Sequence, residues 1–306
     1  MNIFALNPSR KLLNDNFIEK LKNFGEVTYN HEKLPVLEIE GITDPTTDKI
    51  LMISPLYVDW KLDNQTLDAI PNLKAIFLTS TSYSWVDIAY LASKNIPVFN
   101  GGTYSTNAVA EGAIFLAMAI ARKVPLIIQN DWTMDYVNHL GTEIAGKKAG
   151  IVGLGNIGSR IGELAKGIGM DVTYWSRKTR DDRFTYVELD KLFAESDVVF
   201  ITLATSDETK SLITDDMLRS MKQSTIFVSI AHEVYNYNLV NQLVREGKIY
   251  GFGNEEKEDK TNTANGNIWS GVPFVWYTQE SLDRNAEVLL SRMKEFREGD
   301  LGKRVE

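Results

Sequence analysis

The segment that most constrains the fold is Gly153–Gly158, which reads Gly-Leu-Gly-Asn-Ile-Gly. It follows a short apolar run at 149–152, and an amphipathic run at 156–168 begins inside it, so the glycines fall where a buried strand turns into a helix. Such a turn needs residues without side chains where the chain bends and where helix and strand pack closely. A strand, a tight turn and a helix in this order predict one βαβ unit of a parallel sheet.

This glycine turn also has the features of a dinucleotide-binding turn. Gly153 permits the bend, Gly155 leaves the backbone open to a pyrophosphate, and Gly158 lets helix and strand approach. The helix that begins at Asn156 and Ile157 offers backbone N–H groups and a positive dipole end to phosphates. We expect these five residues to bind a dinucleotide cofactor. The alternative is a glycine-rich turn that binds no ligand.

The next strand bears on the choice between NAD and NADP. An acidic residue about 20 positions beyond the glycines would favour NAD. Here the strand 172–175 runs into Ser176, Arg177 and Lys178, with no carboxylate at its end. The two cations suit a 2′-phosphate, which they would hold by charge-assisted hydrogen bonds. We therefore expect NADP in preference to NAD. The alternative is a solvated basic turn.

Apolar and amphipathic runs alternate along nearly the whole chain, which predicts an α/β fold with parallel sheets covered on both faces. Strands are predicted at 3–6, 50–54, 75–79, 97–100, 149–152, 172–175, 198–202, 225–230 and 249–252, and helices at 12–24, 86–93, 107–122, 156–168 and 281–296. The helix at 107–122 is apolar on most sides, so we expect it to be buried, between two domains or two subunits. The polar segment 257–267 is predicted to be a loop.

Length and charge narrow the class of protein. A chain of 306 residues predicts two domains at roughly 150 residues each. The formal net charge of −8 argues against a general nucleic-acid binder, which needs a basic face. No apolar run approaches the roughly 20 residues of a membrane span. The first residues read as a strand rather than a signal peptide.

Scarce residue types narrow the chemistry. The chain has no cysteine, which excludes disulfides and thiolate metal sites and favours the cytoplasm. It has three histidines, His31, His139 and His232, none of them in a His-Glu-x-x-His pattern, so we expect no metal. Any mechanism that needs an imidazole must use one of these three.

Further segments make the chain resemble the D-2-hydroxyacid dehydrogenase family over almost its whole length. These segments are Pro71–Ile76, Tyr104–Glu111 (Tyr-Ser-Thr-Asn-Ala-Val-Ala-Glu), Trp132, Gly141, Gly146-Lys147, Ser196–Val199 and Glu208-Thr209. The resemblance implies two Rossmann-like or flavodoxin-like domains with a cleft between them. Residues 1–99 with 279–306 would bind substrate, and residues 100–278 would bind the dinucleotide.

The resemblance also implies further cofactor residues and a partner. Thr202, Ala204, Thr209, Ile230, Ala231 and Glu255 stand where the family contacts the cofactor. The family usually dimerises through its cofactor domain, and the apolar stretch 113–120 is consistent with a buried helix interface in a homodimer. His139 lies near that contact in the family. It either reaches a neighbouring cleft or, as we expect, lies on the surface.

The chain departs from the family at the reacting centre. The family reduces 2-keto acids with an arginine, a histidine and a glutamate. The arginine position is His232 here, and the histidine position is Phe274, which cannot move a proton. Glu258 is the glutamate counterpart, and Glu255 replaces an aspartate near the nicotinamide. The family's substrate loop G-x-G becomes Ser80-Thr81-Ser82.

Two functions are consistent with these departures. In the first, hydride passes between NADP(H) and a carbonyl or imine carbon of a small molecule. His232 donates the proton or acts as electrophile, and Glu255 or Glu258 orients it. Ser80, Thr81 and Ser82 bind the substrate, and Phe274 and Trp276 make the cleft more apolar.

In the second, the chain binds NADP(H) without turnover and acts as a sensor. A third hypothesis, a conventional 2-hydroxyacid dehydrogenase, would need Lys257 as its carboxylate partner. The alternative for His232 is a neutral residue that caps backbone groups after a strand.

Overall fold

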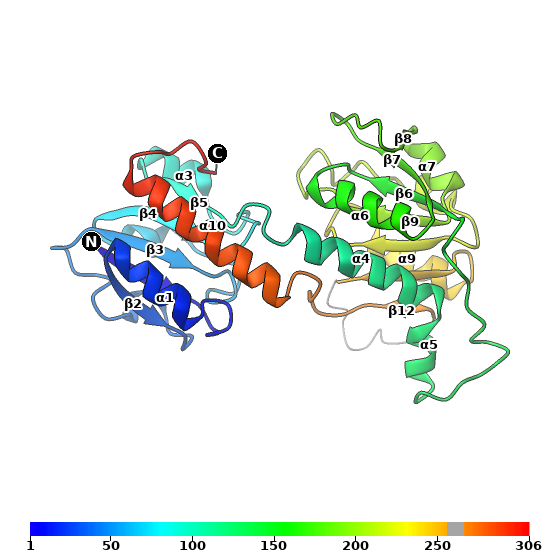
Figure 1. The fold of residues 1–306 in the computed structure, drawn as a ribbon, viewed down its shortest axis with the longest axis horizontal. Coiled ribbons are helices and arrows are strands. Elements are labelled where there is room, and N and C mark those ends of the chain that lie inside the picture. The colour runs from blue at the N-terminus through cyan, green and yellow to red at the C-terminus, as the bar shows by residue number, and fades with distance from the viewer. Residues whose placement is uncertain (256–265, 306) are drawn as a thin grey trace. The chain divides into compact units, whose positions relative to one another are not determined.

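The computed structural model describes residues 1–255 and 266–305. Its internal contacts divide the chain into two compact units (Figure 1). Unit 1 consists of Met1–Ser105 and Thr278–Glu306, and unit 2 is Thr106–Tyr277. Each unit has a parallel sheet with helices on both faces, so the predicted α/β fold is confirmed.

Unit 1 has a five-stranded parallel sheet of order β2-β1-β3-β4-β5, the flavodoxin-like arrangement. Its strands are β1 (Asn2–Leu6), β2 (Glu26–Asn30), β3 (Lys49–Ile53), β4 (Leu73–Leu78) and β5 (Val98–Phe99). β3 and most of β4 are apolar without alternation because both of their faces are covered. The C-terminal ends of these strands form one edge, where ligands bind in folds of this type.

Helices cover both faces of this sheet. α1 (Asp15–Leu21) and α10 (Gln279–Arg297) pack on one face through a cluster that includes Phe17, Phe77 and Leu289. α2 (Asn64–Asp68) and α3 (Ile88–Ser93) pack on the other. The last long helix of the chain therefore belongs to the unit that the N-terminal part builds.

Unit 2 has a seven-stranded parallel sheet of order β12-β11-β10-β9-β6-β7-β8. The strands are β6 (Lys148–Val152), β7 (Asp171–Trp175), β8 (Thr185–Tyr186), β9 (Val198–Ile201), β10 (Ile226–Ser229), β11 (Gly251–Asn254) and β12 (Ile268–Trp269). From β8 to β11 this is the order of the doubly wound dinucleotide-binding fold, with an extra strand at one edge. All strands are parallel, but strands β6 to β8 are added toward one edge of the sheet and strands β9 to β12 toward the other. Ligands bind at such a switch point, which here lies between β6 and β9.

Helices α4 (Thr106–Ala121) and α6 (Asn156–Gly167) cover one face of this sheet, and α7 (Leu189–Glu195), α8 (Asp215–Arg219) and α9 (Tyr237–Arg245) cover the other. A short helix, α5 (Val124–Gln129), follows α4. α4 is buried against α6, β10 and β11 of its own unit, where its alanines permit close packing. The helix is apolar on most sides because it is buried within unit 2, although Phe115 and Met118 stay exposed.

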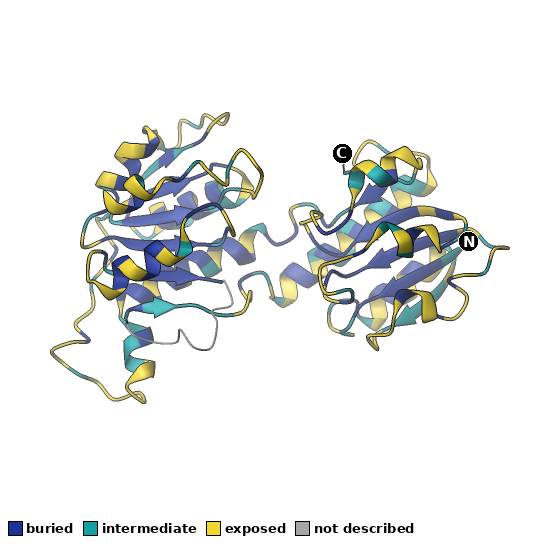
Figure 2. Cartoon of the chain, turned by 180° about the vertical axis from the view of Figure 1, so that it is seen from behind, coloured by how far each residue is buried: buried dark blue, intermediate teal, exposed yellow. Residues whose placement is uncertain are grey.

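The central strands of both sheets are buried, whereas β2, β8 and β12 at the sheet edges are half-buried or exposed, and the exposed residues lie in the loops and on the outer faces of the helices (Figure 2). The predicted elements are present with shifted bounds: the helix expected at 12–24 begins at Asp15, and the strand expected at 249–252 is Gly251–Asn254. The sequence analysis missed β2, β8, β12, α2, α5, α7, α8 and α9, which are short. Among the residues described, none of the helices has the length and apolar character to cross a membrane.

Candidate functional site

The glycine turn closes tightly between β6 and α6. Gly153 has φ +100°, a conformation that side chains disfavour. A Cβ built at Gly158 would overlap the carbonyl oxygen of Gly153, whereas one built at Gly155 would meet nothing within 4 Å. The three glycines therefore do what the sequence predicts: one bends the chain, one leaves space open, and one permits contact.

Thr202 braces this turn from the neighbouring strand. It follows β9, and its Oγ1 lies 2.5 Å from the carbonyl oxygen of Gly153 and 3.1 Å from that of Val152. The hydroxyl thus joins the ends of β6 and β9, the two strands at the switch point. Thr202 is predicted to contact the cofactor, and the structure puts it directly beneath the turn.

The N-terminus of α6 suits an anion. Its N-cap is Gly155, and no side chain caps the first turn. The uncapped N–H groups and the dipole of a 12-residue helix point toward the open space beside Gly155. These features fit the pyrophosphate of a dinucleotide.

A cavity of about 310 Å³ adjoins the turn, which is the size of a small ligand pocket. It is lined by Gly153, Trp175, Ser176, Arg177, Lys178, Leu203, Ala204, Ser206, Glu208, Thr209 and Leu212. The predicted residues Ser176, Arg177, Lys178, Ala204 and Thr209 therefore share one pocket. The loop after β7 and the loop after β9 form its walls.

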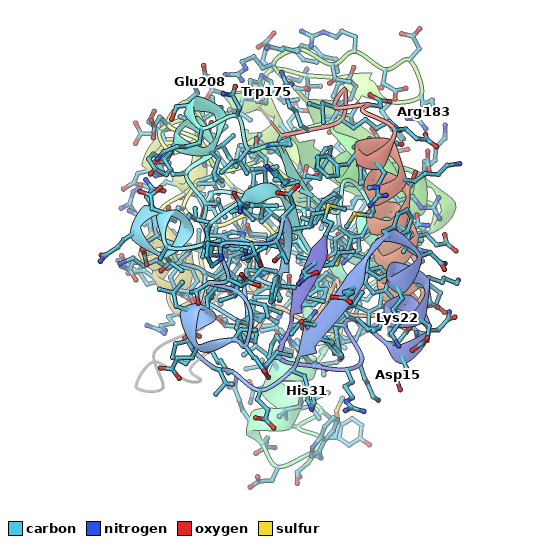
Figure 3. The ribbon with its side chains drawn as sticks, turned by 90° about the vertical axis from the view of Figure 1, so that its left-hand side faces the viewer. Asp15, Lys22, His31, Trp175, Arg183 and Glu208 are labelled. Atoms are coloured by element: carbon cyan, nitrogen blue, oxygen red, sulfur yellow. The ribbon has the colours of Figure 1, made fainter. Side chains whose placement is uncertain are left out.

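Glu208 is the one charged residue in the described lining that the cofactor prediction did not include. It forms an ion pair with Arg177 across the pocket. Trp175, which is labelled together with Glu208 in Figure 3, also lines this pocket. The Oγ1 of Thr209 bonds the carbonyl oxygen of Ala204 at 2.7 Å and accepts the N–H of Ser206 at 2.8 Å, so it holds the loop that carries Glu208.

A second group of predicted residues lies at the C-terminal ends of β10 and β11. Ser229 and Asn254 are register partners, so the segment Ile230–His232 and Glu255 leave the sheet beside each other. His232 is exposed, and its carbonyl oxygen accepts the hydroxyl of Thr205 at 2.7 Å. Ala231 is buried and Ile230 is half-buried, so both pack against the end of the sheet.

Glu255 is a buried carboxylate, 5% exposed. Its Oε1 accepts the backbone N–H groups of Phe274 and Val275, at 2.6 and 2.8 Å. Burial raises the pKa of Glu255, and these two hydrogen bonds and the charge of His232 oppose that rise. The carboxylate of Glu255 thus anchors the segment that begins at Phe274, and the charge of His232 acts on it.

Phe274 belongs to an aromatic cluster with Phe115 and Trp269. The ring centroids lie 5.5 Å apart for Phe115–Trp269, 6.2 Å for Phe115–Phe274 and 6.4 Å for Trp269–Phe274. Phe274 remains 38% exposed. Trp276 is half-buried and stacks edge-on with Tyr277.

The predicted substrate residues of unit 1 follow β4. The Oγ of Ser80 donates to the carbonyl oxygen of Ser82 at 2.6 Å, and the Oγ1 of Thr81 donates to that of Gly102 at 2.8 Å. The Oγ of Ser82 lies 3.4 Å from that of Ser84. These hydroxyls organise the loop at the C-terminal edge of the unit 1 sheet.

Three predictions need a separate statement. Glu258 and Lys257 lie outside the described residues. His139, expected at the surface, is buried: its Nδ1 accepts the N–H of Asp135 at 3.1 Å, and its side chain closes a local turn. That expectation was wrong, because the ring turns inward to accept this backbone hydrogen bond and the residue is only 7% exposed. Across residues 1–255 and 266–305, no three His, Asp or Glu side chains are placed to hold a metal ion.

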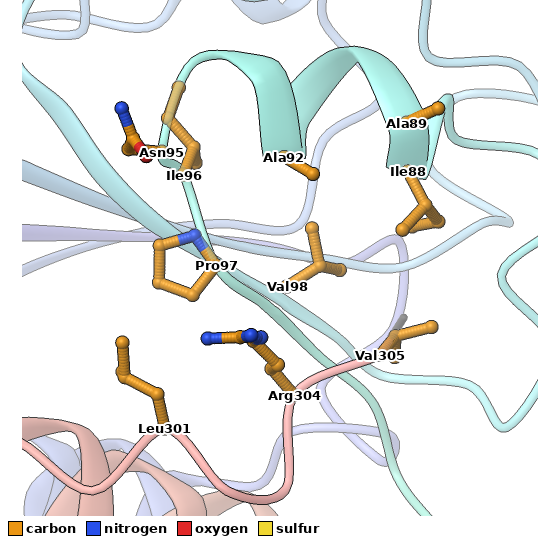
Figure 4. Close-up of a pocket in the computed structure, with 10 residues that line it drawn as sticks. All are labelled: Ile88, Ala89, Ala92, Asn95, Ile96, Pro97, Val98, Leu301, Arg304 and Val305. Atoms are coloured by element: carbon orange, nitrogen blue, oxygen red, sulfur yellow. The ribbon is translucent and has the colours of Figure 1, made fainter.

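A larger cavity, of about 640 Å³, lies in unit 1 between α3, β5 and the C-terminal segment (Figure 4). It is lined by Ile88, Ala89, Ala92, Asn95, Ile96, Pro97, Val98, Leu301, Arg304 and Val305. None of the predicted site residues contributes to it. This cavity is therefore separate from the predicted site residues.

Fold and site together define a two-unit α/β protein with a dinucleotide-binding unit. Residues 114–275, more than half of the chain, match the family model described as D-isomer specific 2-hydroxyacid dehydrogenase, NAD binding domain. The chain belongs to this family, and its unit 2 is an NAD(P)-binding domain.

Named relatives agree with this assignment. A glyoxylate reductase of Thermococcus litoralis is 27% identical over 270 residues, which cover 80% of this chain and 78% of the relative. A hydroxypyruvate reductase of Blautia hydrogenotrophica is 26% identical over 258 residues, covering 78% and 80%.

Solved structures share the fold. An acyclic imino acid reductase in complex with NADPH and D-Arg has a TM-score of 0.85 at 21% identity, with 100% of both chains covered. A D-lactate dehydrogenase from Aquifex aeolicus, complexed with NAD and lactic acid, has a TM-score of 0.80 at 23% identity, covering 100% of this chain and 99% of that one.

The glycine turn yields a first prediction. Gly158→Ala should weaken dinucleotide binding about tenfold or more, because the methyl group must push α6 away from the carbonyl of Gly153. Titration of the cofactor by protein fluorescence measures this. Gly167→Ala is the matched control, since a Cβ there meets nothing within 4 Å, and unchanged binding by the Gly158 variant would contradict the packing argument.

Glu255 yields a second prediction. Because its folded pKa is raised, the native state binds the proton more tightly than the unfolded chain, so stability falls as pH rises above the ordinary range of a glutamate. Glu255→Gln removes this loss, worth about 1.4 kcal/mol for each unit of pKa shift. Denaturant midpoints of both proteins, measured from acid to neutral pH, should diverge as pH rises.

The control for this comparison is Glu233→Gln, an exposed carboxylate on a neighbouring loop. Its midpoints should follow those of the unchanged protein at every pH. Parallel curves for the Glu255 variant and the unchanged protein would show that burial does not perturb the carboxylate.

Proposed function

We propose that the chain is an NAD(P)-dependent reductase that transfers hydride to a carbonyl or imine carbon of a small molecule, with NADPH preferred over NADH. The observation that carries this proposal is the pairing of a buried carboxylate, Glu255, with an exposed imidazole, His232, at the edge of the NAD(P)-binding unit where the strands end. An imidazole that acts as general acid, with a carboxylate beside it, is an arrangement suited to proton transfer.

Each group has a role in this reaction. Bound NADPH supplies a hydride to the electrophilic carbon. His232 delivers a proton to the oxygen or nitrogen of the double bond and returns to the neutral form. Glu255 holds the imidazolium form of His232 before the transfer and, through its bonds to Phe274 and Val275, fixes the aromatic wall.

The choice of cofactor rests on the pocket beside the glycine turn. Ser176, Arg177 and Lys178 line it, and Arg177 and Lys178 carry the positive charge that a 2′-phosphate needs. Structural neighbours of the same fold bind NADPH or NAD, so the proposed preference rests on the charges of this pocket alone.

The substrate class follows from the changed reacting centre. We propose that residues 1–99 and 279–306 contribute Ser80, Thr81 and Ser82, and that Phe274 and Trp276 form an apolar wall. No fixed arginine at position 232 holds a substrate carboxylate, which removes a partner worth about 1.5–3 kcal/mol. An imine is included because the structural neighbour is named as an imino acid reductase.

A second candidate is a non-catalytic NADP(H) sensor. It is favoured by Phe274, which stands at the position of the family's histidine and has no ionisable proton to transfer. The two candidates differ in whether reduced cofactor is consumed.

The test is the absorbance of NADPH or NADH mixed with the protein and with keto acids, neutral carbonyls or imines in turn. We expect loss of absorbance with a neutral carbonyl or an imine. His232→Ala should lower this rate about 10²–10⁴-fold, the usual cost of losing a general acid, while cofactor affinity changes less than about twofold. His31→Ala, in an exposed loop of unit 1, is the control and should leave the rate unchanged.

Three outcomes would count against parts of the proposal. Turnover with keto acids alone would exclude the altered specificity. Full activity of the His232 variant would exclude its role as proton donor. Tight NADPH binding without turnover of any compound would favour the sensor.

We also propose a homodimer. The segment from α5 to Leu140 exposes a run of large apolar side chains in unit 2: Ile128, Trp132, Met134, Tyr136, Val137 and Leu140. Exposed apolar groups gathered on one segment are typical of an interface.

We further propose a cytoplasmic location, because a chain without cysteine suits a reducing compartment such as the cytoplasm.

Light scattering after gel filtration tests the dimer. The unchanged chain should have twice the mass of one protomer, and Val137→Asp with Leu140→Asp should shift it to the monomer. Leu37→Asp, an exposed apolar residue of unit 1, is the control and should remain dimeric. A monomer at micromolar concentration for the unchanged chain would refute the homodimer.

A further inference from the structure

The pocket beside the glycine turn contains a carboxylate that the sequence pattern does not predict. In this fold an acidic residue at the end of the second strand usually holds the adenosine ribose. Here β7 ends in Trp175 and runs into Ser176, Arg177 and Lys178. Glu208 lines the same pocket from the loop after β9, 33 positions beyond the end of β7.

Glu208 is the one acid in the described lining of this pocket. The two acids on the loop after β7, Asp181 and Asp182, do not line the pocket. Asp181 is bound by Arg183, whose Nη2 lies 2.6 Å from its Oδ2, and this interaction lowers the pKa of Asp181 to about 2. Asp182 is exposed and does not line the pocket.

The topology explains how Glu208 reaches this place. β7 and β9 are the two neighbours of β6 in the sheet, so the loops that follow them flank the glycine turn from both sides. Thr209 holds the second loop through its bonds to Ala204 and Ser206. The carboxylate of Glu208 then meets the guanidinium of Arg177 across the pocket.

The ion pair between these residues is exchangeable. The side chains of Arg177 and Glu208 are 56% and 68% exposed, and an exposed pair of this kind contributes only about 0–1 kcal/mol. A ligand group in the pocket can therefore replace either partner at low cost. A hydroxyl competes for the carboxylate, and a phosphate competes for the guanidinium.

We propose that Glu208 limits the preference of this site for NADPH: its carboxylate accepts hydrogen bonds from the adenosine ribose hydroxyls of NADH, and in the presence of NADPH it opposes the 2′-phosphate by charge and by holding Arg177. The carboxylate missing after β7 is thus supplied by another loop. This proposal rests on the dinucleotide binding and NADPH preference argued above, and it makes the preference for NADPH smaller than Arg177 and Lys178 alone would make it.

The two cofactors should respond to one substitution in opposite directions. Glu208→Gln removes the negative charge and frees Arg177, so NADPH should bind about threefold to tenfold more tightly. The same change weakens the charge-assisted bond to the ribose, so NADH should bind about threefold more weakly. Glu208→Ala removes the acceptor altogether and should weaken NADH binding about tenfold.

The experiment is a titration of the full chain with NADPH and NADH, followed by quenching of tryptophan fluorescence, since Trp175 lines the pocket. Asp207→Asn is the matched control, because it removes the same charge from the same loop at an exposed residue outside the lining. Arg177→Gln should weaken NADPH and leave NADH within about twofold. The effects on NADPH should shrink as salt is raised.

The outcomes separate this inference from the proposed function. Opposite shifts for the two cofactors in the Glu208→Gln variant, absent in the Asp207 control, support it. Equal shifts for both cofactors, or no shift, overturn the role of Glu208 and leave the reductase in place. Failure of the unchanged chain to bind either dinucleotide would overturn the proposed function as well.

Discussion

The contact between Gly158 and the carbonyl oxygen of Gly153 is the constraint on which unit 2 depends. It lets α6 begin directly at the end of β6, with its uncapped N-terminus beside the open space at Gly155. Thr202 then joins the turn to β9. Because this point is also where the strand order reverses, the loops after β7 and β9 diverge around it and leave a pocket.

The ionisable groups at the C-terminal edge of the unit 2 sheet differ from those that the family resemblance implies. The buried group is the carboxyl of Glu255, whose pKa burial raises, and the nearby charge that opposes this rise belongs to His232 rather than to an arginine. The backbone of Phe274 and Val275 donates two hydrogen bonds to that carboxylate. The side chain of Glu255 therefore links the loop after β11 to the segment at Phe274 and Val275, so its loss would disturb both.

Much of this protein is predictable from local sequence. The glycine spacing and the apolar runs around it predict the α/β class and the cofactor turn, because turn geometry and burial depend on neighbours in the chain. The motifs around Tyr104 and Ser196 indicate the family, which residues 114–275 match. Short elements such as β2 and β8 escape prediction because they form only against a neighbouring strand.

The sequence by itself determined the fold class, the family and the glycine turn, since each depends on residue types at close spacing. Only the tertiary structure decided which groups the carboxylates meet. Glu208 enters the pocket because β7 and β9 flank β6, although 31 residues separate it from Arg177. Glu255 meets Phe274, 19 positions further along the chain, and His139 accepts the backbone N–H of Asp135 and is buried. These contacts follow from strand order and loop closure, which a linear pattern does not contain.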